Sequence, residues 1–281
     1  MIYAVAGASG QLGQLVLPEL VAQVGAANVV ALVRNPAKLA DLAATGVTVR
    51  AFDYDAADPA ALAGVDRLLL ISANEVGKRS AQHQAVIDAA KAAGVGLIAY
   101  TSILHAPTST IGLAGEHRDT EAALAASGVP HILLRNGWYN ENYTGSLAPS
   151  IEHGAIIGAA GEGRISSASR ADLAAGAVAA LVSGAAGDVY ELAGDESYTM
   201  AEFAGHVARI AGKPVAYVNM TQAEYAAALK GVGLPDWLAD MLANSSYATS
   251  HDQLFDDSRS LSRLVGRPTT PIAVTIAVAL A

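Results

Sequence analysis

The sequence predicts an α/β protein with a doubly wound parallel sheet and a smaller α/β lobe toward the C-terminus. Short apolar segments alternate with alanine-rich segments of helical spacing from the first residues onward. The expected strands are apolar without interruption, as VVALV at residues 29–33 shows, which is typical of parallel strands covered by helices on both faces. Hydrophobic residues make up 52% of the 281 residues and aromatic residues only 5%, a composition that suits close packing of helices on a sheet.

The first half of the chain has a regular alternation of strands and helices. We expect strands at residues 2–6, 29–33, 47–52, 67–71, 96–101 and 131–134. Helices are expected between them at residues 12–24, 37–44, 81–93 and 120–126. Gly94, Gly128 and Pro130 lie where these helices should end, because glycine and proline do not continue a helix.

The alternation weakens after residue 150. Short strands are expected at residues 155–157, 189–192 and 215–218, and helices at residues 171–182, 201–211 and 222–229. A further helix begins at Pro235 and Asp236, and a polar stretch follows at residues 244–257. We therefore expect one folding unit of two domains, with the sheet in residues 1–150 and a smaller lobe in residues 151–281 that completes a substrate cleft.

Acidic residues exceed basic ones in this chain, which has a formal net charge of −9 and no cysteine. An acidic surface repels nucleic acid, and the lack of cysteine removes disulfides, thiolate metal sites and a cysteine nucleophile. No basic stretch precedes the first apolar segment, and the apolar residues 272–281 fall short of the roughly 20 that a membrane helix needs. We expect a cytoplasmic protein without nucleic acid, membrane insertion or a metal.

A glycine-rich turn, GASGQLG at residues 7–13, follows the first expected strand and opens the first helix. In such a turn, glycines permit a tight bend, close approach of a pyrophosphate and close packing of the helix on the strand. The helix N-terminus then offers N–H groups to the phosphates. These features indicate a Rossmann-type dinucleotide-binding domain in residues 1–150, with a structural turn that binds no ligand as the alternative. The spacing of Gly7, Gly10 and Gly13 resembles the short-chain dehydrogenase/reductase superfamily, especially its extended and atypical branches.

The end of the second strand indicates which dinucleotide binds. An NAD enzyme carries Asp or Glu there for the ribose 2′-hydroxyl. This chain has Arg34, with Lys38 close behind, and an arginine can bind the 2′-phosphate that distinguishes NADPH. We therefore expect NADPH, and the alternative is a solvated arginine at a strand end. Asp53, after the third strand, is expected near the adenine.

The acid–base pair of short-chain dehydrogenases, Tyr-x-x-x-Lys, is missing from its expected place. Leu113 and His117 stand where the tyrosine and the lysine would be. Leucine has no proton to donate, and histidine does not stay cationic at neutral pH as lysine does. This absence favours direct hydride transfer to an acceptor, such as a quinone, whose reduced form is a stable anion. His117 either hydrogen-bonds a ribose or a substrate, or is a half-exposed histidine at a helix start.

Aromatic and amide side chains gather after the sixth strand. Trp138, Tyr139 and Tyr143 lie close together in a chain with few aromatics, and Asn136 and Asn142 lie beside them. Ligands of open α/β sheets bind outside the carboxyl ends of the strands, so this cluster can receive a planar acceptor. An aromatic plug that joins the two lobes is the alternative. The loop that follows the fourth strand should border the nicotinamide ribose at the same edge.

Motifs along essentially the whole chain point to one family. They lie at residues 7–13, 33–38, 99–102, 134–143, 191–195, 233–236 and 254–257. Together they resemble the bacterial type 2 NAD(P)H:quinone oxidoreductases of the NmrA-like atypical short-chain dehydrogenase/reductase family, to which triphenylmethane dye reductases are similar relatives. The resemblance implies two-electron hydride transfer from NADPH to a quinone, without flavin or metal.

The residues and the resemblance together predict the site. Expected cofactor contacts are Gly7, Ala8, Ser9, Gly10, Gln11, Leu12, Arg34, Asp53, Ile71, Ser72, Ala73, Asn74, Tyr100, Asn136, Gly137, Trp138, Tyr139, Asn140 and Glu141. The residues expected to line the acceptor site are Asn74, His117, Trp138, Tyr139, Asn142 and Tyr143. None of them is assigned as a catalytic acid.

Two other functions stay open. A redox-sensing regulator of the NmrA type would bind the dinucleotide without turnover, and the missing acid–base pair fits that function as well. A reductase of triphenylmethane dyes or other conjugated electrophiles would share the fold and the cofactor. The sequence favours a quinone reductase because the aromatic cluster offers a surface for a planar acceptor. A monomer or a homodimer is expected.

Overall fold

The computed structural model describes the whole chain except Ser146, and it divides into two compact units. Unit 1 comprises Met1–Ala106, Gly115–Asn136 and Ala171–Tyr190. Unit 2 comprises Pro107–Ala114, Gly137–Arg170 and Glu191–Ala281. Each unit is therefore discontinuous in sequence, and each is described by itself below.

A seven-stranded sheet forms the centre of unit 1, with the strand order β3-β2-β1-β4-β5-β6-β8. The strands are β1 (Tyr3–Ala6), β2 (Val29–Val33), β3 (Thr48–Ala51), β4 (Arg67–Leu70), β5 (Leu97–Ile103), β6 (His131–Asn136) and β8 (Val189–Leu192). All pairings from β3 through β6 are parallel. The direction in which the sheet is built reverses between β1 and β4. The carboxyl ends of these two strands are therefore the place where a doubly wound sheet binds its ligand.

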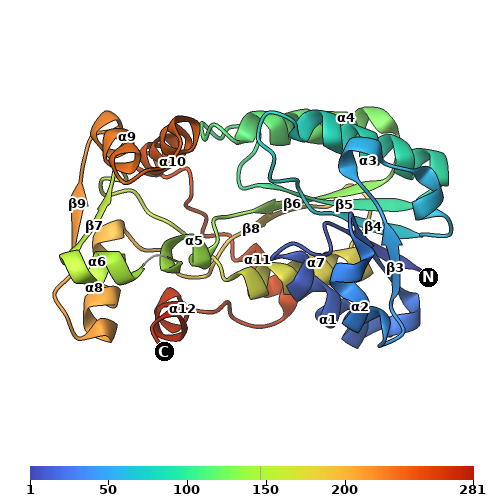
Figure 1. The fold of residues 1–281 in the computed structure, drawn as a ribbon, viewed down its shortest axis with the longest axis horizontal. Helices are drawn as coiled ribbons and strands as arrows, with labels where there is room; N and C mark the ends of the chain where they lie inside the picture. Colours follow the sequence, from blue (N-terminus) through green and yellow to red (C-terminus); the bar gives the residue numbers. More distant parts are fainter. Residues whose placement is uncertain (146) are drawn as a thin grey trace. The chain divides into compact units, whose positions relative to one another are not determined.

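Helices cover both faces of this sheet (Figure 1). On one side lie α1 (Gly13–Val24), α2 (Ala40–Ala43) and α7 (Arg170–Ser183), and on the other lie α3 (Arg79–Ala93) and α4 (Ala114–Ser127). Buried apolar residues of the strands and of α3 form one core cluster, in which Leu68, Ile98 and Ile87 are fully buried. The predicted fold class, a Rossmann-type doubly wound parallel sheet, is confirmed.

Two predicted helices differ from the structure for local reasons. The expected helix at residues 37–44 is a 3₁₀ turn over Pro36–Leu39 followed by the single turn α2, because the Asn35 side chain accepts a hydrogen bond from Ala37 N and caps the shorter turn. The helix expected at residues 120–126 begins earlier, at Ala114, with His117 in its first turn.

Strand β8 lies beyond the boundary that the sequence suggested. It is the neighbour of β6 in the sheet, and Leu133 N donates to Asp188 O over 3.0 Å where the two segments meet. The alternation is weak around β8 in the sequence because its burial is low, with Val189 49% exposed. The functional division of the chain at residue 150 and the substrate cleft stay predictions.

Unit 2 contains a small parallel sheet and seven helices described in full. The sheet pairs β7 (Ala155–Gly158) with β9 (Ala216–Asn219). The helices are α5 (Asn140–Thr144), α6 (Leu147–His153), α8 (Met200–Ala211), α9 (Gln222–Gly231), α10 (Asp236–Thr249), α11 (Ser260–Val265) and α12 (Ile272–Ala279). Thr199 and Thr221 open α8 and α9 with capping boxes that fix where these helices start.

The helix that begins at Asp236 continues into the polar stretch at residues 244–257, because α10 ends only at Thr249. Ser245 and Thr249 are buried, and their hydroxyls donate to the backbone oxygens of Met241 and Ser245, four residues earlier. Polar residues of this kind fit inside a helix because the helix itself satisfies them. Over the described residues, no helix is long and apolar enough to cross a membrane.

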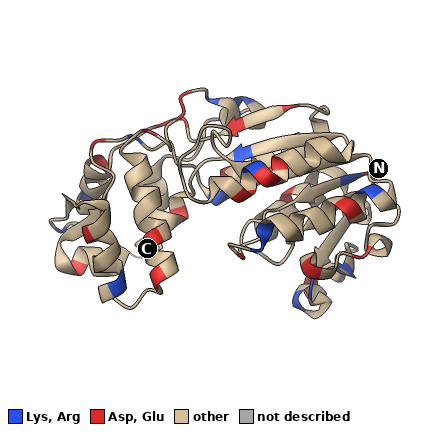
Figure 2. Ribbon diagram, turned by 90° about the horizontal axis from the view of Figure 1, so that it is seen from above, with Lys and Arg blue, Asp and Glu red and all other residues tan. Residues whose placement is uncertain are grey.

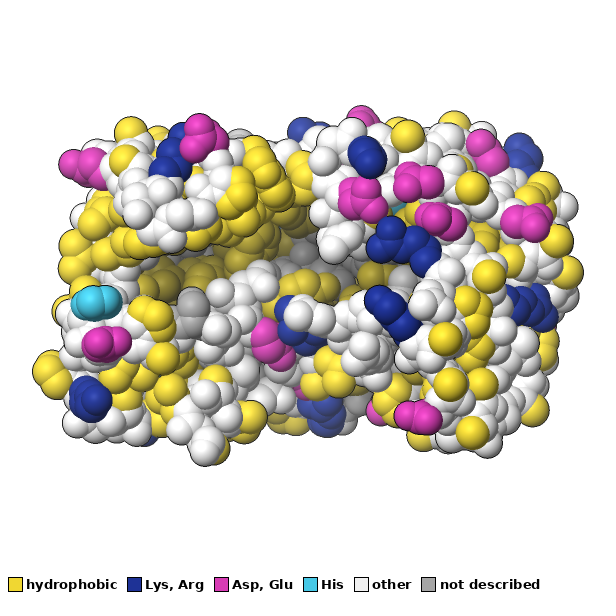
Figure 3. Space-filling view, in the orientation of Figure 1, with side chains coloured by type: hydrophobic (Ala, Val, Ile, Leu, Met, Phe, Trp, Pro, Cys, Tyr) yellow, Lys and Arg dark blue, Asp and Glu magenta, His cyan; other side chains and the backbone are white. Residues whose placement is uncertain are grey.

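Charges of both signs are interspersed along the chain (Figure 2). On the face shown in Figure 3, basic and acidic side chains lie next to one another, and apolar side chains gather over α9 and α10. The broad basic field of a nucleic-acid-binding surface is not present among the described residues of that face.

Candidate functional site

The glycine turn follows β1 and bends sharply at its first residue. Gly7 has a φ of +77°, in the left-handed region that favours glycine. A Cβ atom on Gly7 would lie 3.3 Å from Ile71 Cβ and 3.3 Å from the Tyr54 hydroxyl. Gly10 N donates to Gly7 O over 2.9 Å and closes the turn. The turn after β1 therefore lies directly against the segment that follows β4.

Gly13 lets helix α1 start against the turn. A Cβ atom on this residue would lie 2.5 Å from Gly7 O and 2.8 Å from Ala8 O, which is closer than a real side chain approaches backbone. The first turn of α1 carries no acidic side chain. Because N–H groups at a helix start lack partners within the helix and carry partial positive charge, this end of α1 can bind phosphates.

Arg34 follows β2 and extends into solvent, with 69% of its side chain exposed. Its Nη1 atom lies 3.8 Å from Oε1 of Glu75, a residue of the loop after β4. The other carboxylate oxygen of Glu75 lies 3.3 Å from Lys78 Nζ. An arginine with this exposure can turn toward a 2′-phosphate, and Glu75 is the anion with which that phosphate would compete.

Asp53 and Tyr54 follow β3 and have different surroundings. One carboxylate oxygen of Asp53 accepts a hydrogen bond from Asp55 N over 3.2 Å and caps a short turn. The Tyr54 hydroxyl donates to Ile71 O over 2.8 Å, and burial raises the pKa of Tyr54 above its ordinary value. Tyr54 thus connects the ends of β3 and β4 beneath Gly7.

The loop after β4 is held by side chains from neighbouring elements. Ser72 N donates to Thr101 Oγ1 of β5 over 2.8 Å. Ala73 N donates to Nε2 of His83, and Ala73 O accepts from Nε of Arg79. The sequence placed Ser72 and Ala73 at the nicotinamide ribose but did not identify the side chains that hold them. Asn74, also predicted there, is exposed.

Asn136 ends β6 with a buried amide that has no partner. Only 7% of the residue is exposed, yet neither Oδ1 nor Nδ2 has a hydrogen-bond partner among the described residues. Leaving a buried polar group unpaired costs about 1–3 kcal/mol, so this amide indicates a ligand that completes it. Asn136 lies at the carboxyl end of a parallel strand, paired in register with Ile103, where such a ligand is expected.

Tyr100 and His117 form a hydrogen-bonded pair that is buried and not exposed to solvent. His117 is 6% exposed and Tyr100 is fully buried, and His117 Nδ1 lies 2.7 Å from the Tyr100 hydroxyl. His117 Nε2 lies 3.4 Å from Arg79 Nη1. The expectation of a half-exposed histidine is wrong, because α4 starts earlier than predicted and turns His117 into the core of unit 1.

The buried setting keeps His117 neutral. Desolvation, and then the nearby Arg79 guanidinium, lower the pKa of His117 to about 3. Both ring nitrogens are also occupied, one by Arg79 and the other by Tyr100. His117 is therefore neutral at neutral pH and has no free N–H that could donate a proton to a ligand. Leu113, expected where the tyrosine of the missing pair would stand, is half-buried just before α4.

In unit 2 the residues after Gly137 fall into two groups. Asn140 is fully buried, and its amide is used internally, because Oδ1 accepts from Ser167 and Nδ2 donates to Thr275. Glu141 accepts from Arg170 N over 3.0 Å. These two side chains act as structural supports of the segment. Their predicted contact with the cofactor stays a prediction.

The other group can face a ligand. The Arg170 guanidinium lies 4.7 Å above the Tyr139 ring, and Trp138 beside it is half-buried. Asn142 is exposed. Tyr143 packs against Tyr198 and Phe203, which also belong to unit 2, and burial raises its pKa well above the ordinary value. The alternative of an aromatic plug that joins the two lobes stays a prediction.

Several side chains at this site were not found from the sequence. Arg79 and His83 lie four residues apart on α3, and Arg170 lies at the start of α7. The spacing of Arg79 and His83 was a usable signal, since residues four apart lie on one face of a helix. Over the described residues, no group of three or more His, Asp or Glu side chains could hold a metal ion.

Comparison with known proteins places the chain in a family. A protein-family profile described as NAD(P)H-binding matches residues 7–183, from the glycine turn to the end of α7. The chain belongs to this NAD(P)H-binding family. It is 55% identical over 276 residues to quinone oxidoreductase 2 of Escherichia coli. The aligned residues cover 97% of this chain and 96% of that protein.

Solved structures agree with this placement. The E. coli NADPH-dependent quinone oxidoreductase QOR2, complexed with NADPH, superposes with a TM-score of 0.97 at 54% identity over 100% of both chains. Triphenylmethane reductase of Citrobacter sp. gives a TM-score of 0.92 at 35% identity, over 100% of this chain and 99% of that one. The resemblance that the sequence motifs indicated is confirmed.

Proposed function

We propose that this protein is an NADPH-dependent quinone oxidoreductase. The observation that carries the proposal is the 55% identity to E. coli quinone oxidoreductase 2 along 97% of the chain. The geometry of unit 1 supports it, because the glycine turn, Arg34 and the unpartnered Asn136 amide all lie at the carboxyl ends of parallel strands. The NmrA-type regulator, which binds without turnover, is supported less well, since the relative with this coverage is named as an oxidoreductase.

The residues of unit 1 fit NADPH. The pyrophosphate would lie against the backbone of Gly7 to Leu12 at the start of α1, which Gly13 allows to approach the turn closely. Arg34 would bind the 2′-phosphate, Asp53 would lie near the adenine, and the Asn136 amide would meet an uncharged polar group. When bound, NADPH supplies the hydride that reduces the acceptor.

The protein's part in the chemistry is to bind and orient. His117 and Tyr100 are buried and hydrogen-bonded to each other, so neither offers a proton to a ligand. An acceptor whose reduced form is a stable anion needs no such donor, and solvent can protonate it later. A quinone has this property because the negative charge spreads over its ring and both oxygens. Positioning alone can then supply much of the rate.

The acceptor would contact the aromatic segment of unit 2. Tyr139 and Trp138 offer flat surfaces, and Asn142 offers an exposed amide. The contacts of Asn74 and Tyr143 with the acceptor, expected from the sequence, stay predictions. We also propose a monomer or a homodimer, as expected from the sequence, and gel filtration tests this. The proposed location is the cytoplasm, where NADPH is available, and cell fractionation tests it.

A reductase of triphenylmethane dyes is the second candidate, because the Citrobacter enzyme shares the fold at 35% identity. A panel of quinones and triphenylmethane dyes separates the two, with NADPH oxidation followed by absorbance. We expect kcat/KM to be at least tenfold higher for a benzoquinone or naphthoquinone than for any dye. A preference for the dyes would make them the substrate class.

A further inference from the structure

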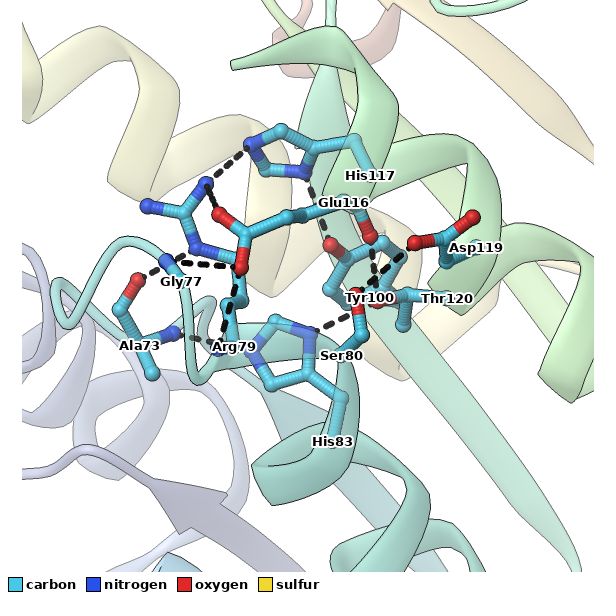
Figure 4. Close-up of polar contacts among 10 residues, drawn as sticks. All are labelled: Ala73, Gly77, Arg79, Ser80, His83, Tyr100, Glu116, His117, Asp119 and Thr120. Atoms are coloured by element: carbon cyan, nitrogen blue, oxygen red, sulfur yellow. Dashed lines mark hydrogen bonds and ion pairs between the residues drawn. The ribbon is translucent and has the colours of Figure 1, made fainter.

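Both backbone polar groups of Ala73 are held by buried side chains of α3 (Figure 4). Ala73 N donates to His83 Nε2 over 2.9 Å, and Ala73 O accepts from Arg79 Nε over 2.7 Å. His83 is fully buried and Arg79 is 6% exposed. A loop peptide normally finds water for these groups, so its capture by two buried polar side chains is a specific arrangement.

The hydrogen bonds around His83 each have one possible direction. Since Ala73 N donates to Nε2, the ring proton must lie on Nδ1, which is 2.9 Å from Thr120 Oγ1. The Thr120 hydroxyl then donates to Glu116 O over 2.9 Å. His83 is thus a neutral histidine with a fixed tautomer, and it connects the loop after β4 to α4.

Glu116 of α4 holds the same loop at a second point. Its Oε1 atom accepts from Gly77 N over 3.0 Å and from Arg79 N over 3.2 Å. Figure 4 shows this carboxylate between the Arg79 guanidinium and the loop. The segment between Ala73 and Gly77 is therefore fixed at both ends by side chains from α3 and α4.

The fixed segment lies at the point where the sheet reverses direction. It follows β4, the neighbour of β1, and Ile71, two residues before Ala73, lies against the position that a Cβ atom on Gly7 would occupy. Ligands of doubly wound sheets bind at this point. The loop is neither helix nor strand. Its internal backbone hydrogen bonds, from Val76 N to Asn74 O and from Lys78 N to Glu75 O, close turns after Ala73, so the backbone of Ala73 itself is held by the side chains of α3.

We propose that His83 and Arg79 are positioning residues for NADPH, which fix the backbone of Ala73 so that the loop presents its peptide groups to the nicotinamide half of the cofactor. This inference rests on the proposed function, because it takes the loop as part of the cofactor site. The two side chains act through the loop and do not themselves touch the cofactor. A purely structural role would change the melting temperature without changing NADPH affinity in the folded protein.

Three substitutions of His83 separate its contact with Ala73 N from its contact with Thr120. His83→Gln places an amide oxygen near the position of Nε2 and keeps an acceptor for Ala73 N. His83→Asn keeps a polar group near Nδ1 for Thr120 but loses that acceptor, and His83→Leu loses both. Val86→Ala is the matched control, since Val86 is also fully buried on α3 and its truncation leaves the loop contacts intact.

NADPH dissociation constants and quinone KM values are measured for the folded variants well below their melting temperatures. We expect His83→Asn and His83→Leu to weaken NADPH binding about tenfold, because the half-buried Ala73 N–H loses the acceptor that fixes the loop. His83→Gln should restore the affinity to within about threefold of the unsubstituted protein. The quinone KM should change less than twofold, and Val86→Ala should lower the melting temperature alone. If the leucine variant does not fold, the asparagine variant carries the test.

Unchanged NADPH affinity in His83→Asn would overturn the inference, as would an equal loss of affinity in Val86→Ala. Arg79→Leu provides an independent measurement, and an affinity equal to that of the unsubstituted protein would likewise contradict it. Failure of the proposed function gives a different result. In that case the unsubstituted protein binds NADPH without reducing any quinone, while the affinities of the His83 variants still decide the positioning role.

Discussion

Arg34 and Glu75 lie 3.8 Å apart on the surface of unit 1, and the proposed 2′-phosphate site includes this arginine. Exposed ion pairs contribute little to stability, so Arg34 is available to a stronger anion. Arg34→Asp should remove the preference for NADPH over NADH, because it replaces a cation with a carboxylate that repels the phosphate. A charge-assisted hydrogen bond is worth about 1.5–3 kcal/mol, so NADPH affinity should fall at least tenfold. Titration with both dinucleotides measures the effect.

Two control variants separate the effect of Arg34 from a general change of charge on unit 1. Glu75→Gln keeps Arg34 and removes the competing carboxylate, so NADPH should bind with equal or higher affinity. Lys91→Asp reverses an exposed charge on the last turn of α3 and should leave both affinities unchanged. An Arg34→Asp variant with the original ratio of affinities would show that another residue selects the cofactor.

His117 provides the second test at the level of single residues. Its pKa is lowered to about 3 and both ring nitrogens are occupied, so it is neutral at pH 7. His117→Ala should therefore lower kcat by tenfold or less. A positioned general acid contributes about 10²–10⁴-fold. A thousandfold loss of kcat, with fold and NADPH affinity intact, would make His117 a proton donor and refute the acid-free reaction.

The sequence predicted residue types better than residue environments. Arg34 at a strand end and the glycines of the turn could be identified because their roles depend on local spacing. The burial of His117 could not, since it depends on where α4 starts and on Arg79 from a different helix. The same reason hid His83, whose partners Ala73 and Thr120 come from separate segments.

Among the secondary structure elements, α1 depends most clearly on one residue, because Gly13 allows the helix to start against the glycine turn. A Cβ atom on Gly13 would lie 2.5 Å from Gly7 O, so Gly13→Ala must move either the helix or the turn. We expect a loss of about 1–3 kcal/mol in the free energy of unfolding and a tenfold or larger loss of NADPH affinity. Urea denaturation and NADPH titration measure the two effects.

Gly205 is the matched control for this substitution. It lies exposed within α8, and a Cβ atom there would meet nothing within 4 Å. Gly205→Ala should raise the free energy of unfolding by about 0.8–1 kcal/mol, because alanine favours the helix, and should not change NADPH binding. A Gly13→Ala variant that behaves like Gly205→Ala would show that α1 does not need its close approach to the turn.

Strands and long helices were predictable because their periodicity is local. The predicted strands at residues 29–33 and 189–192 match β2 and β8 in their bounds. The short helices α5, α6 and α11 were missed, since none is long enough for a periodic pattern to emerge. The place of β8 in the large sheet was not predictable from the strand itself, because pairing with β6 joins distant segments.

For the molecule as a whole, buried neutral histidines predict how stability depends on pH. Burial, followed by the charge of Arg79, lowers the pKa values of His83 and His117 to about 3, against an ordinary value of 6.5. Around them lie Tyr100 and Glu116. Below pH 6.5 the unfolded chain takes up protons on these rings while the folded chain does not. The contribution of these histidines to stability is therefore constant above pH 6.5, and stability falls as the pH decreases from 6.5 toward 3.

The expected loss is about 1 kcal/mol per histidine between pH 6.5 and pH 5.5. Urea denaturation at a series of pH values measures it. His83→Gln removes one of the two rings and should roughly halve the dependence on pH in this range. Stability that is flat or increases as the pH falls from 6.5 to 5.5 would contradict the buried neutral state.

The central claim is that the protein itself transfers hydride from NADPH to a quinone, without flavin or metal. The most direct measurement is the number of NADPH molecules oxidised per protein chain, under anaerobic conditions, by purified flavin-free and metal-free protein with 1,4-benzoquinone in excess. We predict many turnovers, with one quinone consumed per NADPH and a rate that exceeds the reaction without protein. NADPH that binds but is oxidised no faster than in the protein-free reaction would contradict the claim and favour a sensor of the dinucleotide.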